Sequence, residues 1–195
     1  MNGASFQCGQ LEILSLAELR KQANDVSGDR TKMLRVAESS IGLAEIDEKL
    51  SRMSEIELDQ LRAKLRIGVQ WDTQVTLDGC EHLVTQAYCS ALPVAYSSLP
   101  SKNWERFARL VLEAAYEATF ATAVLNAGST GNKSVYLTLL GGGAFGNEQE
   151  WILDAIGRAC KLFKHVNMDV KIVSYRRSNL AVRNLIDTVT QTVNG

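Results

Sequence analysis

A strand pattern runs directly into a cluster of four glycines at residues 141–146, and this feature constrains the chain more than any other. The β-rich run at 134–140 is typical of a buried strand, and a helical pattern begins directly after Asn147. Because glycine lacks a Cβ atom, it lets the backbone turn sharply and lets N–H groups approach a ligand. The N–H groups and positive dipole end of the following helix favour anions. The segment therefore predicts either a diphosphate-binding loop or a tight strand-to-helix turn.

The spacing within the glycine cluster separates several kinds of loop. It does not match the Walker loop, because the required Lys and Ser/Thr are absent. Gly141, Gly143 and Gly146 satisfy G-x-G-x-x-G, but the acid expected about 20 residues later is Asp169, which begins a strand instead of ending one. In the alternative of a plain turn, Asn147 and Glu150 form a capping box that satisfies the helix N-terminus.

The chain after residue 66 alternates between strand and helix patterns. Strands are predicted at 66–71, 83–90, 134–140 and 169–175, and helices at 101–126, 148–164 and 178–192, with Ser101 as a helix N-cap. This order is typical of an α/β fold with a mostly parallel sheet, in which ligands collect at the carboxyl ends of the strands.

Residues 1–66 have a different pattern, with no convincing strand. Helices are predicted at 10–25 and 42–65, and the second is amphipathic, so it needs a partner surface. We therefore divide the chain into a helical segment, 1–66, and an α/β domain, 67–195, and we expect a protein partner for the helical segment.

Composition excludes several classes of protein. With 46% hydrophobic residues, 22% charged residues and a net charge of −1, the chain reads as an ordinary soluble globular protein. No apolar run approaches about 18 residues, and the first residues do not resemble a signal peptide, so we expect a cytoplasmic or nuclear protein without a membrane partner. Four scattered cysteines and two histidines predict neither a disulfide framework nor a metal site.

A local basic excess lies near the C-terminus. Residues 158–183 hold seven Lys and Arg against one acid. The excess is too small for a nucleic-acid reader, so we expect no nucleic-acid partner. It indicates either a solvated face or a field that favours a small anionic ligand.

Two aspartates are candidates for acid–base chemistry. Asp72 ends the first predicted strand and Asp78 follows closely, so both are candidate catalytic residues. Both are also turn formers, since Thr73 follows the first and Gly79 the second. Cys89 has no evident histidine partner, so covalent catalysis is not expected.

The segment VYLTLLGGGAFGN, followed by a helix with EWILDAIGRA, resembles the second ligand loop of macrodomains, which bind ADP-ribose. Three upstream pieces are similar to a divergent branch of the same family, and the resemblance covers residues 66–177; the pieces are GVQWDTQVT, QAYCSALPVAYSS and FARLVLEAAYEATFATAVLNAG. It implies a three-layer macrodomain-like fold, a mostly parallel sheet flanked by helices, with ADP-ribose as the ligand and no cofactor.

The resemblance also implies roles for individual residues. The diphosphate and distal ribose would be held by Gly141, Gly142, Gly143, Ala144, Phe145, Gly146 and Asn147. Pro93–Tyr96 would lie beside this loop, and Tyr175 would lie near the adenine. Macrodomains normally begin with strands and a first ligand loop, which residues 1–66 do not offer, so we expect those parts to be missing.

We therefore expect a module that binds ADP-ribose or a related nucleotide diphosphate, free or on an ADP-ribosylated protein, with hydrolysis of ADP-ribose linkages as its activity if Asp72 or Asp78 is catalytic. One alternative is a non-catalytic or degenerate homologue that acts as an interaction module. Another is a dinucleotide binder of the NAD type.

Overall fold

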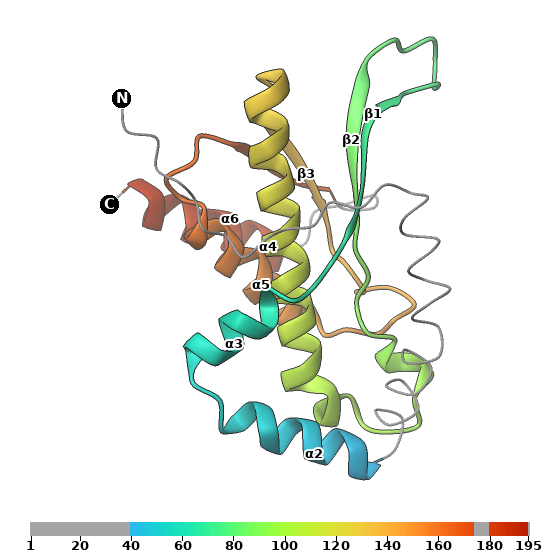
Figure 1. Cartoon of the computed structure of the whole chain (residues 1–195), viewed down its shortest axis with the longest axis vertical. Helices are drawn as coiled ribbons and strands as arrows, with labels where there is room; N and C mark the ends of the chain where they lie inside the picture. The colour runs from blue at the N-terminus through green and yellow to red at the C-terminus, as the bar shows by residue number, and fades with distance from the viewer. Residues whose placement is uncertain (1–39, 174–179, 195) are drawn as a thin grey trace.

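The computed structural model describes residues 40–173 and 180–194, which form a mixed α/β structure, as the sequence predicts (Figure 1). The helix predicted at 10–25 and the candidate ligand residue Tyr175 lie outside the described residues.

The helix predicted over 42–65 is in fact two helices, α2 (Ser40–Ser51) and α3 (Glu55–Arg62). Ser54 separates them because it caps α3: its side chain accepts a hydrogen bond from the N–H of Glu57, whose carboxylate accepts one from the N–H of Ser54 at 2.8 Å. The apolar residues of α2 find their partner surface within the chain, since Leu43 lies in the core and α2 packs against α4.

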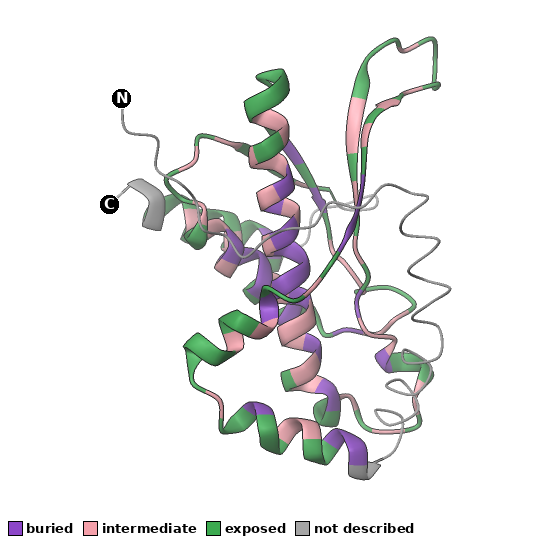
Figure 2. Ribbon diagram, viewed as in Figure 1, coloured by how far each residue is buried: buried purple, intermediate pink, exposed green. Residues whose placement is uncertain are grey.

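The long helix α4 (Glu105–Thr130) is the centre of the structure (Figure 1). Ser101 does not cap it; this residue begins a short 3-10 helix, η2 (Ser101–Trp104), that leads into α4. Gly131, with φ of +76°, ends α4 in the left-handed conformation that glycine adopts without strain. Buried residues gather on α4 and on α5 (Gln149–Leu162), which pack together (Figure 2).

The first two strands form an antiparallel hairpin, which corrects the prediction of one mostly parallel sheet. β1 (Gly68–Gln74) and β2 (Leu83–Tyr88) pair with each other and project from the helices (Figure 1). A tight turn closes the hairpin at its tip: the N–H of Cys80 donates to the carbonyl of Leu77 at 3.0 Å. The two residues between them, Asp78 (φ +50°) and Gly79 (φ +71°), are both left-handed.

The last two strands are parallel, as predicted. β3 (Ser134–Thr138) and β4 (Asp169–Val173) are joined by the crossover helix α5, and α6 (Leu180–Asn194) packs against α5. In the described part of the chain the four strands therefore make two separate two-stranded sheets.

β2 and β3 both run along α4 in the direction opposite to that helix. Near the start of β2, the Thr85 hydroxyl donates to the side chain of Asn126 late in α4, and just beyond its end the Cys89 thiol bonds the carbonyl of Ala115. β3 begins just after α4 ends and finishes beside Tyr116. The carboxyl ends of β2 and β3 therefore both lie beside the middle of α4, near Ala115 and Tyr116.

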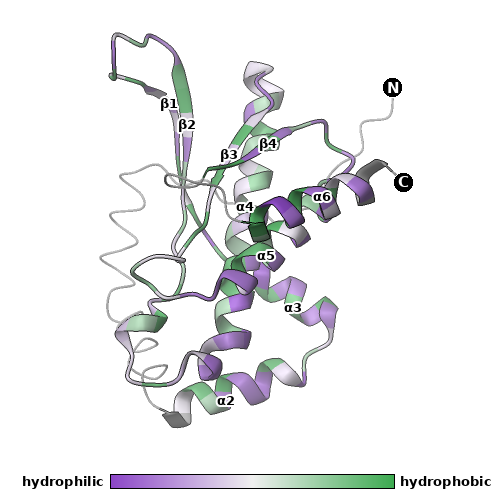
Figure 3. Ribbon diagram, turned by 180° about the vertical axis from the view of Figure 1, so that it is seen from behind, coloured by the Kyte–Doolittle hydropathy of each residue, from purple (hydrophilic) through white to green (hydrophobic). Residues whose placement is uncertain are grey.

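The core lies between α4, α5 and the inner face of β3. Strand β3 is largely hydrophobic, whereas α3 is largely hydrophilic (Figure 3). Searched over the described residues alone, the structure contains no helix with the length and apolar character needed to cross a bilayer.

Candidate functional site

The glycine cluster forms a closed loop between β3 and α5. The N–H of Asn147 donates to the carbonyl of Gly141 at 3.0 Å, and the N–H of Gly146 donates to the carbonyl of Gly143 at 3.0 Å. Gly141 and Gly146 have φ of +76° and +67°, a region that costs other residues strain. A Cβ atom on Gly141 would lie 2.4 Å from the Cβ of Ala91, so packing as well as backbone conformation requires glycine there.

Asn147 fastens this loop to the segment that follows β2. Its side chain is buried, and the amide nitrogen donates to the carbonyl of Leu92 at 2.8 Å and to that of Gly141 at 3.4 Å. A capping box of Asn147 and Glu150 is therefore the wrong interpretation. Glu148 occupies the N-cap position of α5 and makes no side-chain capping bond. The first turn of α5 thus keeps its backbone donors.

The tip of the loop presents backbone donors to solvent. Gly142, Gly143 and Ala144 are exposed. Within residues 40–173 and 180–194, the N–H groups of Gly143, Ala144 and Phe145 have no hydrogen-bond acceptor. The first backbone bond into α5 is donated by Ile152 to Glu148, which leaves the preceding N–H groups of the helix open as well. Consecutive N–H groups beside a helix N-terminus form a general anion-binding arrangement.

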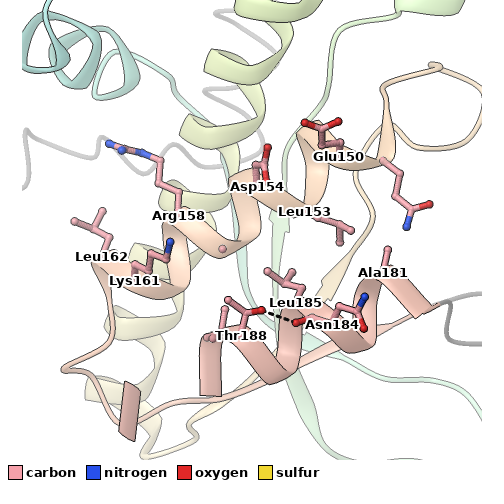
Figure 4. Close-up of a pocket in the computed structure, with 13 residues that line it drawn as sticks. Glu150, Leu153, Asp154, Arg158, Lys161, Leu162, Ala181, Asn184, Leu185 and Thr188 are labelled. Atoms are coloured by element: carbon pink, nitrogen blue, oxygen red, sulfur yellow. Dashed lines mark hydrogen bonds between the residues drawn. The ribbon is translucent and has the colours of Figure 1, made fainter. Parts of the chain in front are cut away.

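An arginine on α4 holds the acidic residue in the first turn of α5. The guanidinium of Arg109 contacts Glu150 at 3.1 Å, Asp154 at 2.6 Å and Glu105 at 3.0 Å. Glu150 and Asp154 extend from the same side of α5 (Figure 4). This pairing directs the negative charge of Glu150 toward α4, so it weakens the repulsion that a bound phosphate would otherwise meet.

Tyr96 lies beside the loop. It ends the 3-10 helix η1 (Val94–Tyr96), and its ring meets that of Phe145 edge to face, with centroids 5.7 Å apart. The N–H of Ala95 donates to the carbonyl of Phe145 at 2.9 Å. Tyr96 is 71% exposed, so a ligand on the loop can reach its ring. The structure therefore brings together all of the described loop residues and Tyr96.

The two candidate catalytic aspartates lie on the hairpin, away from this loop. Asp72 is exposed, with φ of +52°, at an irregularity in β1 opposite the first half of β2. Val84, the partner of Thr73, precedes the end of β2 by four residues, or ~13 Å at the usual rise per residue. Asp78 forms the hairpin turn. The structure does not bring either carboxylate to the loop.

Two residues that the sequence patterns did not identify support the site. The Tyr116 hydroxyl donates to the carbonyl of Thr138 at 2.7 Å and accepts from the N–H of Leu140 at 2.9 Å, which fixes the last residues before the loop. Arg109 is the other. Arg109 follows Glu105 by four residues, a spacing that predicts an ion pair within one helix. No sequence pattern links Arg109 or Tyr116 to the loop.

The remaining chemistry of the described residues is limited. Burial raises the pKa of the Cys89 thiol, which bonds Thr119, so the thiol stays protonated at neutral pH. In the described part of the chain, no group of three His, Cys, Asp or Glu side chains is arranged to hold a metal ion. Asp169 begins β4 and pairs with Lys171, which is not the position of a ribose-binding acid in a dinucleotide fold.

Two grooves lie next to the ends of the loop, one beside the start of α5 and one beside the end of β3. One, of about 1040 Å³, lies between α5 and α6, and Leu153 and Leu185 both lie in the space between the two helices (Figure 4). The other, of about 760 Å³, lies between β2 and β3 over α4 and includes Leu140, the residue before Gly141.

The chain matches no family model, no curated protein and no solved structure.

Proposed function

We propose that this chain is a macrodomain-like module that binds ADP-ribose, free or attached to a protein, through the loop of Gly141–Asn147. One observation carries the proposal: the consecutive N–H groups of Gly143, Ala144 and Phe145, the first two on exposed residues, lack acceptors among the described residues and lie beside the open first turn of α5. A diphosphate offers closely spaced anionic oxygens to such donors. The three-layer macrodomain arrangement is part of this proposal.

The residues around the loop would contact the ribose or hold the loop in shape. Phe145 and Tyr96 offer adjoining aromatic surfaces to a ribose, and Asn147 holds the loop in shape from its buried position. The Arg109–Glu150 pair reduces the negative potential at the helix end. The proposal is for binding; it assigns no hydrolytic step to Asp72, which lies on the hairpin.

Titration calorimetry with ADP-ribose tests the proposal, with a matched pair of leucine substitutions. A Cβ at Gly143 or at Gly128 would meet no atom within 4 Å, so both sites have room for the start of a side chain. Gly143→Leu places that side chain where the phosphates would lie, and we expect binding to fall at least about a hundredfold, or ~2.7 kcal/mol. Gly128→Leu, far along α4, should leave it unchanged.

AMP and NAD serve as comparison ligands. AMP lacks the diphosphate, so it should bind more weakly than ADP-ribose. No heat of binding with ADP-ribose at high micromolar concentration, or equal binding by wild type and Gly143→Leu, contradicts the proposal. A clear preference for NAD over ADP-ribose would instead favour a dinucleotide binder.

A further inference from the structure

Among the residues that the structure describes, β2 and β3 each have one unpaired edge, and the two edges border the same groove. Each described sheet contains two strands, β1 with β2 and β3 with β4, so one side of β2 and one side of β3 form no backbone ladder. The groove of about 760 Å³ between them is lined by residues of both strands, with α4 as its floor. Unpaired strand edges are templates for another extended chain.

The two edges suit one added strand. β2 and β3 run in the same direction along α4, and both have their carboxyl ends near residues 115–119 of that helix. A strand laid between them would have hydrogen-bonding edges on both sides and would join the two sheets into one. Strand addition of this kind takes its affinity from main-chain hydrogen bonds and its specificity from alternate side chains.

The lining of the groove indicates a polypeptide and not a polyanion. Its polar groups are hydroxyls and amides, with those of Thr119, Thr122 and Asn126 on the floor. Among the described residues that line it, Asp72 is the single charged one, and none is Lys, Arg or His. Nucleic acid needs cations for its phosphates, whereas the backbone of a peptide is neutral and matches the unpaired edges.

The position of the groove indicates which polypeptide binds there. The four strands predicted from the sequence are all in use in the described sheets, so no other described segment is available as a strand for the groove. At its lower end the groove includes Thr138 and Leu140, which lead directly into Gly141. A peptide in the groove therefore ends beside the proposed ADP-ribose loop.

From these contacts we infer that the groove binds the modified protein itself: a segment of the ADP-ribosylated polypeptide adds as an extended strand between β2 and β3 while its ADP-ribose occupies the loop. This inference rests on the proposed function. It makes the partner's main chain, and not the nucleotide alone, a source of affinity.

Binding measurements with four probes test the inference. The probes are ADP-ribose, a peptide of roughly the length of β2 with ADP-ribose on a serine near its end, the unmodified peptide, and the modified peptide with N-methylated backbone amides in its central part. We expect the modified peptide to bind at least about tenfold more tightly than ADP-ribose, a gain of ~1.4 kcal/mol. N-methylation, which removes main-chain donors, should abolish that gain.

A pair of substitutions on α4 localises the effect. Ala123 lines the groove, so Ala123→Phe should abolish the gain and leave binding of ADP-ribose alone unchanged. Leu125 is 49% exposed on the same helix and is not part of the lining, so Leu125→Phe should change neither value. Hydrogen exchange gives a measure that needs no substitution: the modified peptide should protect amides of β2 and β3, and ADP-ribose alone should not.

The outcomes separate the two proposals. Equal affinities for modified peptide and ADP-ribose, or a gain that survives in Ala123→Phe with no protection of the strands, overturn the inference and leave the proposed function standing. Peptide binding that depends on Ala123 but is the same with and without ADP-ribose overturns the proposed function and, with it, the assignment of the groove to a modified protein. A protein that binds none of the probes overturns both. A wild-type protein whose groove is already protected from exchange before peptide is added contains its own strand, and this also overturns the inference.

Discussion

Two glycines of the loop have different roles: one is needed for the backbone conformation, and the other leaves the loop surface open to a ligand. Gly141 has a left-handed backbone and no room for a Cβ, whereas Gly143 has neither restriction. Sequence alone does not distinguish the two, because both lie in one run of three glycines. The structure assigns Gly141 to folding and leaves Gly143 open for the proposed ligand.

Alanine substitutions at these two glycines should therefore have different effects on stability. Gly141→Ala should lower the free energy of unfolding by about 3 kcal/mol, since it adds both a strained φ and a contact with the Cβ of Ala91. Gly143→Ala should change it by less than about 0.5 kcal/mol. Urea denaturation followed by circular dichroism measures both values. Equal stability of the two variants would contradict the closed loop.

Tyr116 is the residue through which α4 holds the end of β3. Its hydroxyl donates to Thr138 and accepts from Leu140. Tyr116→Phe removes both bonds, while the N–H of Leu140 keeps its second bond to the carbonyl of Thr138 at 3.0 Å, so we expect a loss of about 1 kcal/mol. Tyr136→Phe is the control, because this tyrosine is 64% exposed and the phenyl ring is retained.

The same residue predicts a dependence of stability on alkaline pH. Burial raises the pKa of Tyr116 to about 12, although the hydrogen bond from Leu140 opposes the shift. The unfolded chain loses this proton first, near its ordinary pKa of 10.0, so stability should fall as the pH rises from about 10 to about 12, by about 2 kcal/mol. Denaturation at several pH values should show a smaller fall in Tyr116→Phe. An identical fall in that variant would assign the dependence to other groups.

At the scale of elements, α3 is held to the helical core by charge. Arg62 is almost fully buried and contacts Glu113 of α4 at 2.7 Å as well as Glu55 and Asp59 of its own helix. Arg158 of α5 contacts the same two acids of α3. Acids on α3 are therefore shared between arginines on two helices, so the three helices are fixed together by one network.

Removal of the buried arginine should show what this network contributes. Arg62→Met keeps most of the apolar stem but leaves Glu113 without its partner, and we expect a loss of about 2 kcal/mol in thermal or urea denaturation. Arg52 pairs with Glu48 on the surface, with 75% and 60% of the two side chains exposed, so Arg52→Met should change stability by less than about 0.5 kcal/mol. If both variants are equally stable, the network does not hold α3 in place.

Periodicity predicted the elements well and their pairing poorly. The helices at 148–164 and 178–192 and the strands at 134–140 and 169–175 were found close to their observed bounds. Alternating apolar residues do not encode the partner of a strand, so the β1–β2 hairpin was not predicted. The Asp78-Gly79 pair was its local signal, and Ser54 with Glu57 was the signal for the break between α2 and α3.

At the scale of the whole molecule, two two-stranded sheets of described residues lie along one central helix, and the glycine loop lies at the level where β2 and β3 end (Figure 1). The sequence predicted the loop because glycine spacing is a local property. It could not predict the roles of Arg109 and Tyr116, because their contacts join residues more than 20 positions apart. Nor could it show that Asp72 lies on the hairpin away from the loop, since that depends on strand pairing.

The central claim is that the N–H groups at the tip of the loop bind the diphosphate of ADP-ribose, and an amide-resolved NMR titration tests it most directly. Addition of ADP-ribose to the isotopically labelled protein should shift the amide signals of Gly143, Ala144 and Phe145 strongly and together, with smaller shifts in the first turn of α5. Amides at the hairpin tip, such as Gly79, should not move. A saturable titration that shifts other amides and leaves these three unchanged would contradict the claim.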